Sequence, residues 1–352
     1  MWRERRRRGF APREPAGSVE DTTTQAFPAP PPVGRWARDV LGEGFEARTL
    51  PLDDDEEGEV VATIVRHTRT SKRPVSHAVL YLHGWSDYFF QSELAEYWTE
   101  RGAAFYALDL RKYGRSLRVH QTAGFVESLS EYDDDIEAAL EVIASEEGAD
   151  TAVVVMGHST GGLVAVLWAD RHPGRLHALV LNAPWLELQG SAVARTLSQP
   201  VIEGLARFQP KAVLPLNDLG FYDRTLHAAH GGEWTWEPLW RPSPSFPVRA
   251  GWLSAVLNGH AQVAKGLTVD APILMLASDR TVISPRWSED MRSADIVLDV
   301  ELLARRAILL GPTVTIARIA GAVHDVILSP PAIRAGAYAQ IDRWARAYID
   351  RA

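Results

Sequence analysis

The motif Gly-His-Ser-Thr-Gly at positions 157–161 holds the residues best suited to chemistry. It follows the apolar run of residues 151–157 and opens an amphipathic segment, so it predicts a sharp turn between a strand and a helix. Such a turn exposes the hydroxyl of Ser159, and the helix N-terminus offers N–H donors to a developing negative charge. The motif therefore predicts a nucleophilic serine. The alternative is an ordinary turn in which Ser159 only caps the helix.

A nucleophilic serine needs a base, and His324 is the best placed of the eleven histidines. It follows the last apolar run and precedes the final amphipathic segment. The loops that follow parallel strands meet at one edge of a sheet, so we expect His324 beside Ser159. His158, inside the motif of Ser159, and His83, on another loop, are interpreted as structural residues, and His83 also as a residue of the substrate pocket. No metal or other cofactor is expected, because only the pair His227 and His230 suggests one.

Two aspartates are candidates for the acid that orients the imidazole. Asp279 directly follows the apolar run of residues 271–278, and Asp295 precedes the amphipathic segment of residues 299–310. Either carboxylate could stabilise the charged imidazole. Asp325 adjoins His324 and would have to turn back, so it is the weakest candidate.

An oxyanion site is expected from two backbone N–H groups, those of Trp85 and Thr160. Trp85 lies in the loop His-Gly-Trp at positions 83–85, after the apolar run of residues 77–82. Two fixed donors would supply a large part of the catalysis, since the loss of one typically costs roughly 3 kcal/mol.

The elements that must position these residues alternate along the chain. We expect strands at residues 45–50, 59–66, 77–82, 103–110, 151–157, 177–183, 271–278 and 312–319. We expect helices near residues 92–101, 132–146, 160–171, 299–310, with Asp299 as N-cap and Gly311 as C-cap, and 331–350. The first two strands flank the acidic turn of residues 53–58, interpreted as solvated. Apolar strands with helices between them predict an α/β fold with a doubly wound, mostly parallel sheet.

The alternation stops at residues 184–262, between the sixth and seventh strands. This stretch carries five of the twelve tryptophans and no clear strand, and insertions of this length are often lids. We therefore expect an α/β core at residues 35–183 and 263–352 with an inserted cap. Trp185, Trp236 and Trp252 are candidates for the substrate pocket, although cap aromatics can also serve only to pack the cap onto the core.

Composition excludes several classes of protein. The chain has 352 residues, a formal charge of −8 and no cysteine. An acidic chain is a poor partner for nucleic acid, and thiolate or disulfide chemistry is excluded. No apolar run is long enough to predict a transmembrane segment. Residues 1–34, with six prolines and an arginine run, predict an unfolded extension without an export signal, and the expected location is cytoplasmic.

From residue 45 to about residue 350 the chain resembles the α/β-hydrolase superfamily, most of all the branch of monoacylglycerol lipases and lysophospholipases. The resemblance rests on HGW at 83–85, LDLRKYGRS at 108–116, GHSTGG at 157–162 and GAVHD at 321–325, in the family's order. Lys112, Tyr113 and the bulky Trp85 depart from its pattern. The resemblance implies an acid about thirty residues before the histidine. Asp295 lies 29 residues before His324 and Asp279 lies 45 before it, which favours Asp295.

The function expected is a serine hydrolase that cleaves small carboxylic esters with an apolar acyl group, such as monoacylglycerols or lysophospholipids, through an acyl-enzyme. One alternative on the same fold is an aminopeptidase or amidase. It would need a carboxylate for the substrate amine, and nothing selects among Glu187, Glu203 and Glu233. The other alternative is a member of the fold that binds a ligand without catalysis.

Overall fold

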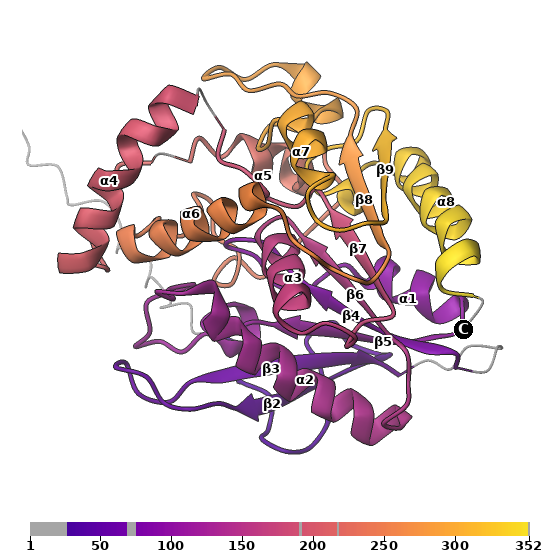
Figure 1. Cartoon of the computed structure of the whole chain (residues 1–352). Helices are drawn as coiled ribbons and strands as arrows, with labels where there is room; N and C mark the ends of the chain where they lie inside the picture. Colours follow the sequence, from indigo (N-terminus) through magenta and orange to yellow (C-terminus); the bar gives the residue numbers. More distant parts are fainter. Residues whose placement is uncertain (1–26, 69–74, 190–191, 217, 351–352) are drawn as a thin grey trace, which may run out of the picture.

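The computed structural model describes residues 27–68, 75–189, 192–216 and 218–350, and a nine-stranded sheet crosses its centre (Figure 1). The strands lie in the order β1-β2-β3-β5-β4-β6-β7-β8-β9. Their bounds are β1 Ala37–Arg38, β2 Phe45–Pro51, β3 Val61–His67, β4 His77–Leu82, β5 Ala103–Asp109, β6 Val153–His158, β7 Ala178–Asn182, β8 Ile273–Ser278 and β9 Val314–Ile319. The first three pairs in this order are antiparallel and the remaining five are parallel. The predicted mostly parallel α/β fold is confirmed.

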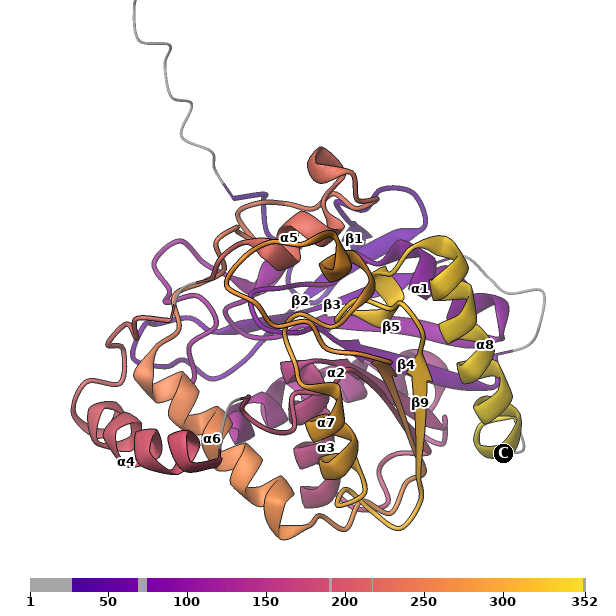
Figure 2. The same cartoon turned by 90° about the horizontal axis from the view of Figure 1, so that it is seen from above.

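Helices cover both faces of the sheet. They are α1 Ser92–Glu100, α2 Tyr132–Glu147, α3 Thr160–Arg171, α4 Ala192–Phe208, α5 Phe221–Leu226, α6 Ala250–Lys265, α7 Val300–Ala307 and α8 Pro331–Tyr348. One core cluster joins the sheet to α2, α3, α6 and α7, and a second joins the opposite face to α1 and α8. Figure 2 shows α1 and α8 together on one side of the strands and α2, α3 and α7 on the other.

Strand β4 illustrates why the central strands read as continuous apolar runs. All six of its residues are buried. Ala78, Leu80 and Leu82 belong to one core cluster, and Val79 and Tyr81 belong to the other. Successive side chains of a strand point to opposite faces, so a strand covered on both faces needs apolar residues at nearly every position.

The insertion of residues 184–262 holds helices and, in its described part, no strand. Helix α4 packs along α6, away from the sheet (Figure 1). Helix α6 runs without interruption to Lys265, so the expected boundary at residue 262 falls inside a helix. Trp252, on α6, is buried against the core.

The expected unfolded extension of residues 1–34 is wrong for its last eight residues. Pro31 and Pro32 accept hydrogen bonds from the hydroxyl and N–H of Thr49, and Val33 pairs with the same residue. Phe27 packs against the core. The segment runs beside β2 because proline supplies carbonyl acceptors although it lacks an N–H donor. The arginine run lies outside the described residues.

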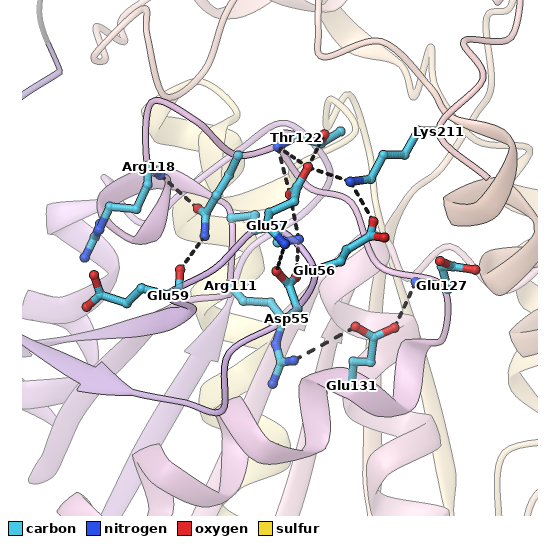
Figure 3. Close-up of polar contacts among 12 residues, drawn as sticks. Asp55, Glu56, Glu57, Glu59, Arg111, Arg118, Thr122, Glu127, Glu131 and Lys211 are labelled. Carbon is cyan, nitrogen blue, oxygen red and sulfur yellow. Dashed lines mark hydrogen bonds and ion pairs between the residues drawn. The ribbon is translucent and has the colours of Figure 1, made fainter. Parts of the chain in front are cut away.

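The acidic turn between β2 and β3 is not simply solvated. Glu57 accepts hydrogen bonds from the N–H and hydroxyl of Thr122 and contacts the ammonium group of Lys211 (Figure 3). It also contacts the ammonium group of Lys112. Its side chain is only 11 % exposed. Because Lys211 belongs to the insertion, Glu57 joins the hairpin, the core and the insertion at one point.

The predicted ends of α7 differ in outcome. Asp299 caps the N-terminus, as predicted, by accepting from the N–H groups of Glu301 and Leu302. The predicted C-cap at Gly311 is wrong, because the helix ends at Ala307 and Ile308 is its C-cap. A Cβ at Gly311 would lie 2.4 Å from the carbonyl oxygen of Val269, so close approach to that backbone explains the glycine. None of the described helices combines the length and apolar character needed to cross a membrane.

Candidate active site

Ser159 lies at the turn where β6 passes into α3. Its φ is +51°, a region that residues with a side chain rarely adopt. Glycines on both sides make room for this turn. A Cβ at Gly157 would lie 2.6 Å from the carbonyl oxygen of Gly161, and one at Gly161 would lie 2.2 Å from that of His83. The turn therefore needs small residues at both ends to hold the hydroxyl of Ser159 above the sheet edge.

A continuous series of hydrogen bonds links Ser159, His324 and Asp295. The Oγ of Ser159 lies 3.0 Å from Nε2 of His324, and Nδ1 of the same ring lies 2.9 Å from Oδ2 of Asp295. All three side chains are buried. Oδ1 of Asp295 accepts from the N–H groups of Val297 and Leu298, so the carboxylate is fixed on both oxygens. This geometry suits a serine nucleophile with an imidazole base.

The two candidate acids occupy different places. Asp279 is exposed and accepts a hydrogen bond from the N–H of Gly321. Asp295 reaches the sheet edge because its own backbone pairs with the segment that follows β8. Its N–H donates to Arg280, and its carbonyl accepts from Val282. This pairing brings the later aspartate, and not the earlier one, to the imidazole.

Asp325 directs its carboxylate away from His324. Oδ1 accepts from Nδ2 of Asn182 at 2.6 Å and from the N–H of Ile327, and Oδ2 accepts from Nε2 of Gln91 at 3.3 Å. Asn182 is the last residue of β7, so these bonds tie the loop that carries the histidine to the neighbouring strand end. This role leaves no geometry for Asp325 as the triad acid.

The loop of residues 83–86 lies directly against the serine turn. A Cβ at Gly84 would lie 3.2 Å from the Cβ of Ser159. Thr160 is the first residue of α3, so its N–H is one of the helix donors that no intrahelical carbonyl can reach. Trp85 and Ser159 line the same cavity.

His83 and His158 are buried beneath the site. Nε2 of His83 accepts from the N–H of Leu110, and its Nδ1 faces the carbonyl of Gly84. Burial lowers the pKa of both histidines, so both are held neutral. Nδ1 of His158 lies 3.0 Å from the carbonyl of Asn182, and His158 also lines the cavity beside Ser159.

A cavity of about 220 Å³ opens beside Ser159 and His324. The core contributes the loop of residues 84–87, and the insertion contributes Tyr222, Arg241 and neighbouring residues. Nε of Arg241 lies 3.0 Å from Oδ1 of Asp87, and the guanidinium lies 4.0 Å from the ring centroid of Trp236. Burial raises the pKa of Asp87, and the charge of Arg241 opposes that rise. The cavity wall therefore includes a buried ion pair, although most of the surface that it exposes is apolar.

The predicted pocket residues do not line this cavity in the described part of the chain. His83 is buried, the guanidinium of Arg241 lies 4.0 Å from the ring centroid of Trp236, and the ring centroids of Trp252 and Trp85 are 3.7 Å apart. Trp185 is half-buried and packs against the core. A part for these residues in substrate binding stays a prediction, and the aromatic contacts favour the alternative that such rings pack the insertion onto the core.

Sequence reasoning missed most residues of the cavity wall, among them Asp87 and Arg241. Asp87 could have been found, since it comes two residues after the expected oxyanion loop. Nothing in the sequence singles out Arg241. In the histidine pair of the insertion, Nδ1 of His227 accepts a hydrogen bond from the N–H of Ala229.

Comparison with known proteins gives distant relatives. A phospholipase, YtpA, of Bacillus subtilis (strain 168) is 34 % identical over 125 residues, which are 35 % of this chain and 45 % of the relative. A monoacylglycerol lipase of Mycolicibacterium smegmatis is 33 % identical over 109 residues, 30 % of this chain and 37 % of the relative. This chain therefore spans less than half the length of these curated relatives.

Solved structures and a family model agree on the fold. A soluble variant of monoglyceride lipase from Saccharomyces cerevisiae matches with a TM-score of 0.62 and 14 % identity, covering 85 % of this chain and 94 % of that one. A carboxyl esterase from Bacillus coagulans matches with a TM-score of 0.58 and 16 % identity, covering 86 % and 99 %. The sequence model of the serine aminopeptidase S33 family matches residues 73–331. The chain belongs to this family of α/β-hydrolases.

Proposed function

We propose that the protein is a serine hydrolase that cleaves carboxylic esters with an apolar acyl group, with monoacylglycerols and lysophospholipids as natural examples. The observation that carries this proposal is the hydrogen-bonded series from Ser159 through His324 to Asp295. The names of the relatives, a phospholipase and a monoacylglycerol lipase, favour ester substrates.

The chemistry follows from the proposed roles. Nε2 of His324 takes the proton of Ser159 as Oγ attacks the ester carbonyl, and the N–H groups of Trp85 and Thr160 bind the resulting oxyanion. The imidazolium then protonates the departing alcohol, which leaves an acyl-enzyme. Water attacks this acyl group with the same imidazole as base, releases the acid and restores the hydroxyl. Asp295 holds the ring and stabilises its charged form.

The insertion of residues 184–262 is proposed to act as the cap of this site. Support comes from Tyr222 and Arg241, which belong to the insertion and line the cavity beside Ser159. A cap of this kind excludes water from the acyl-enzyme and shapes the pocket.

An aminopeptidase is the second candidate, because Asp87, Asp218 and Asp223 line the cavity and a free amine needs an anionic partner. The ion pair with Arg241 makes Asp87 a weaker partner. Of the glutamates considered from the sequence, Glu187 contacts Arg306 and Glu233 lies 3.5 Å from Arg334.

A matched panel of p-nitrophenyl esters and aminoacyl p-nitroanilides tests the proposal. We expect the wild type to cleave esters faster than anilides and Ser159→Ala to cleave neither. Faster anilide cleavage would favour the aminopeptidase. Undiminished ester cleavage by the Ser159→Ala variant would refute the assignment of the nucleophile.

A further inference from the structure

A second cavity of about 250 Å³ lies next to the catalytic one, between α5 and the segment of residues 282–297. Seven of its ten lining residues are aliphatic, methionine or phenylalanine side chains. They are Leu219, Phe221, Val282, Ile283, Met291, Ile296 and Val297. We name this cavity the α5 groove.

The α5 groove adjoins the catalytic cavity. Asp218, Tyr222 and Val297 line both. The ring centroid of Tyr222 lies 5.5 Å from that of His324, and the N–H of Val297 donates to Asp295. A substrate bound at Ser159 would reach the groove past these three shared residues.

The two cavities differ in the charged residues that line them. The residues Asp87, Asp218, Asp223 and Arg241 line the cavity around Ser159, whereas Asp218 is the one charged residue among the ten that line the α5 groove. Polar ligand atoms can pair with charged groups, and a hydrocarbon chain cannot. The α5 groove is therefore the better place for the hydrocarbon chain.

Two residues on opposite walls of the α5 groove leave apolar surface uncovered. Leu219 is 54 % exposed and Ile283 is 58 % exposed. Burial of apolar surface stabilises a complex in proportion to the area removed from water, so a chain lying between these side chains gains binding energy.

From this arrangement we infer that the α5 groove holds the hydrocarbon chain of the ester, while the group on the other side of the ester bond lies against Asp87 and Arg241. This inference rests on the proposed ester hydrolase function. It deepens that function by assigning an amphiphilic substrate, with one apolar chain and one polar group, a defined direction across Ser159.

The test fills the α5 groove and measures chain-length dependence in two series of esters. The first series varies the acyl chain of p-nitrophenyl esters from two to twelve carbons. The second varies the alcohol of alkyl acetates over the same lengths. Ile283→Trp is the test variant, and Leu219→Trp approaches the groove from the opposite wall. Val119→Trp is the control, since Val119 is 83 % exposed and lines neither cavity.

For each variant we compare kcat/KM for the longest ester with kcat/KM for the shortest ester. In one of the two series, we expect Ile283→Trp and Leu219→Trp to lower this ratio by at least about tenfold. Val119→Trp is expected to keep the wild-type ratio. The affected series tells whether the acyl or the alcohol chain occupies the groove.

An unchanged ratio in both series would overturn the groove assignment, including the case in which all chain lengths lose activity equally. Failure of the wild type to cleave any ester would be a different result. It would overturn the proposed function and, with it, the groove assignment.

Discussion

At residue scale, the site combines a motif that is local in sequence with a contact that is not. The residues around Ser159 predict the strained turn, because only glycine tolerates the close backbone approaches at positions 157 and 161. The same reasoning predicted that His324 would meet Ser159, and the two side chains lie 3.0 Å apart. The residues alone left two aspartates as candidates for the acid. The backbone pairing of Asp295 with Arg280 and Val282 brings one of them to the imidazole, and it is a tertiary contact that no local pattern reveals.

Replacing the proposed acid tests that contact. Asp295→Asn is expected to lower kcat by about four orders of magnitude, because the amide can no longer fix the tautomer that accepts the proton of Ser159. Asp279→Asn is the matched control, since Asp279 is exposed and bonds only the N–H of Gly321 in the described structure. We expect it to change kcat by less than about tenfold. A larger loss in the control than in Asp295→Asn would reverse the assignment.

At the scale of elements, apolar runs predicted the central strands well, because strands covered on both faces leave little room for polar residues. Element ends were less predictable. Gly311 was predicted to be a C-cap, but a glycine is needed there because the carbonyl oxygen of Val269 leaves no room for a Cβ. Lys112, a departure from the family's pattern, is buried against Glu57, and its partner lies in a distant hairpin turn. Such contacts depend on which turns the fold brings together.

The turn around Glu57 makes a pH-dependent contribution to stability. Burial opposes ionisation, but hydrogen bonds from Lys112, Lys211 and Thr122 outweigh it and hold the pKa of Glu57 well below its usual range. A carboxyl group whose pKa is lower in the folded than in the unfolded state stabilises the fold above the unfolded pKa, about 4.3, and loses this contribution as pH falls below it.

We therefore expect Glu57→Gln to lower the free energy of unfolding by about 1–2 kcal/mol at pH 7, measured by urea denaturation. The difference from wild type should shrink as the pH is lowered from 5 to 3. Glu56→Gln is the control, because Glu56 also contacts Lys211 but its side chain is 63 % exposed. Equal losses in both variants at pH 7, or a Glu57→Gln difference that stays the same from pH 5 to pH 3, would contradict this account.

At the scale of the whole molecule, alternating strands and helices predicted the architecture. The predicted end of the N-terminal extension, residue 34, and the predicted end of the insertion, residue 262, differ from the structure. The composition of the insertion suggested a pocket lined by its tryptophans. Trp252 instead lies against Trp85 of the core, and neither Trp252 nor Trp185 lines the cavity beside Ser159. Composition reports how much apolar surface is available and not which surface it covers.

The tryptophan contact between insertion and core should be essential for stability. Trp252 is 1 % exposed, and its ring stacks on Trp85. Trp252→Ala should lower the free energy of unfolding by about 3–5 kcal/mol, because it leaves a cavity between α6 and the loop beside Ser159. Trp36→Ala, at a partly buried position, serves as control in the same urea titration and should cost less than half as much. Similar losses in both variants would show that the contact does not hold the insertion.

The central claim is that Ser159 is the nucleophile activated by His324. The most direct measurement treats the wild type with a fluorophosphonate and locates the adduct by peptide mass spectrometry. We predict one modified residue, Ser159, and a labelling rate that drops sharply in a His324→Ala variant. An adduct on another residue, or labelling of Ser159 at the same rate without the imidazole, would contradict the claim.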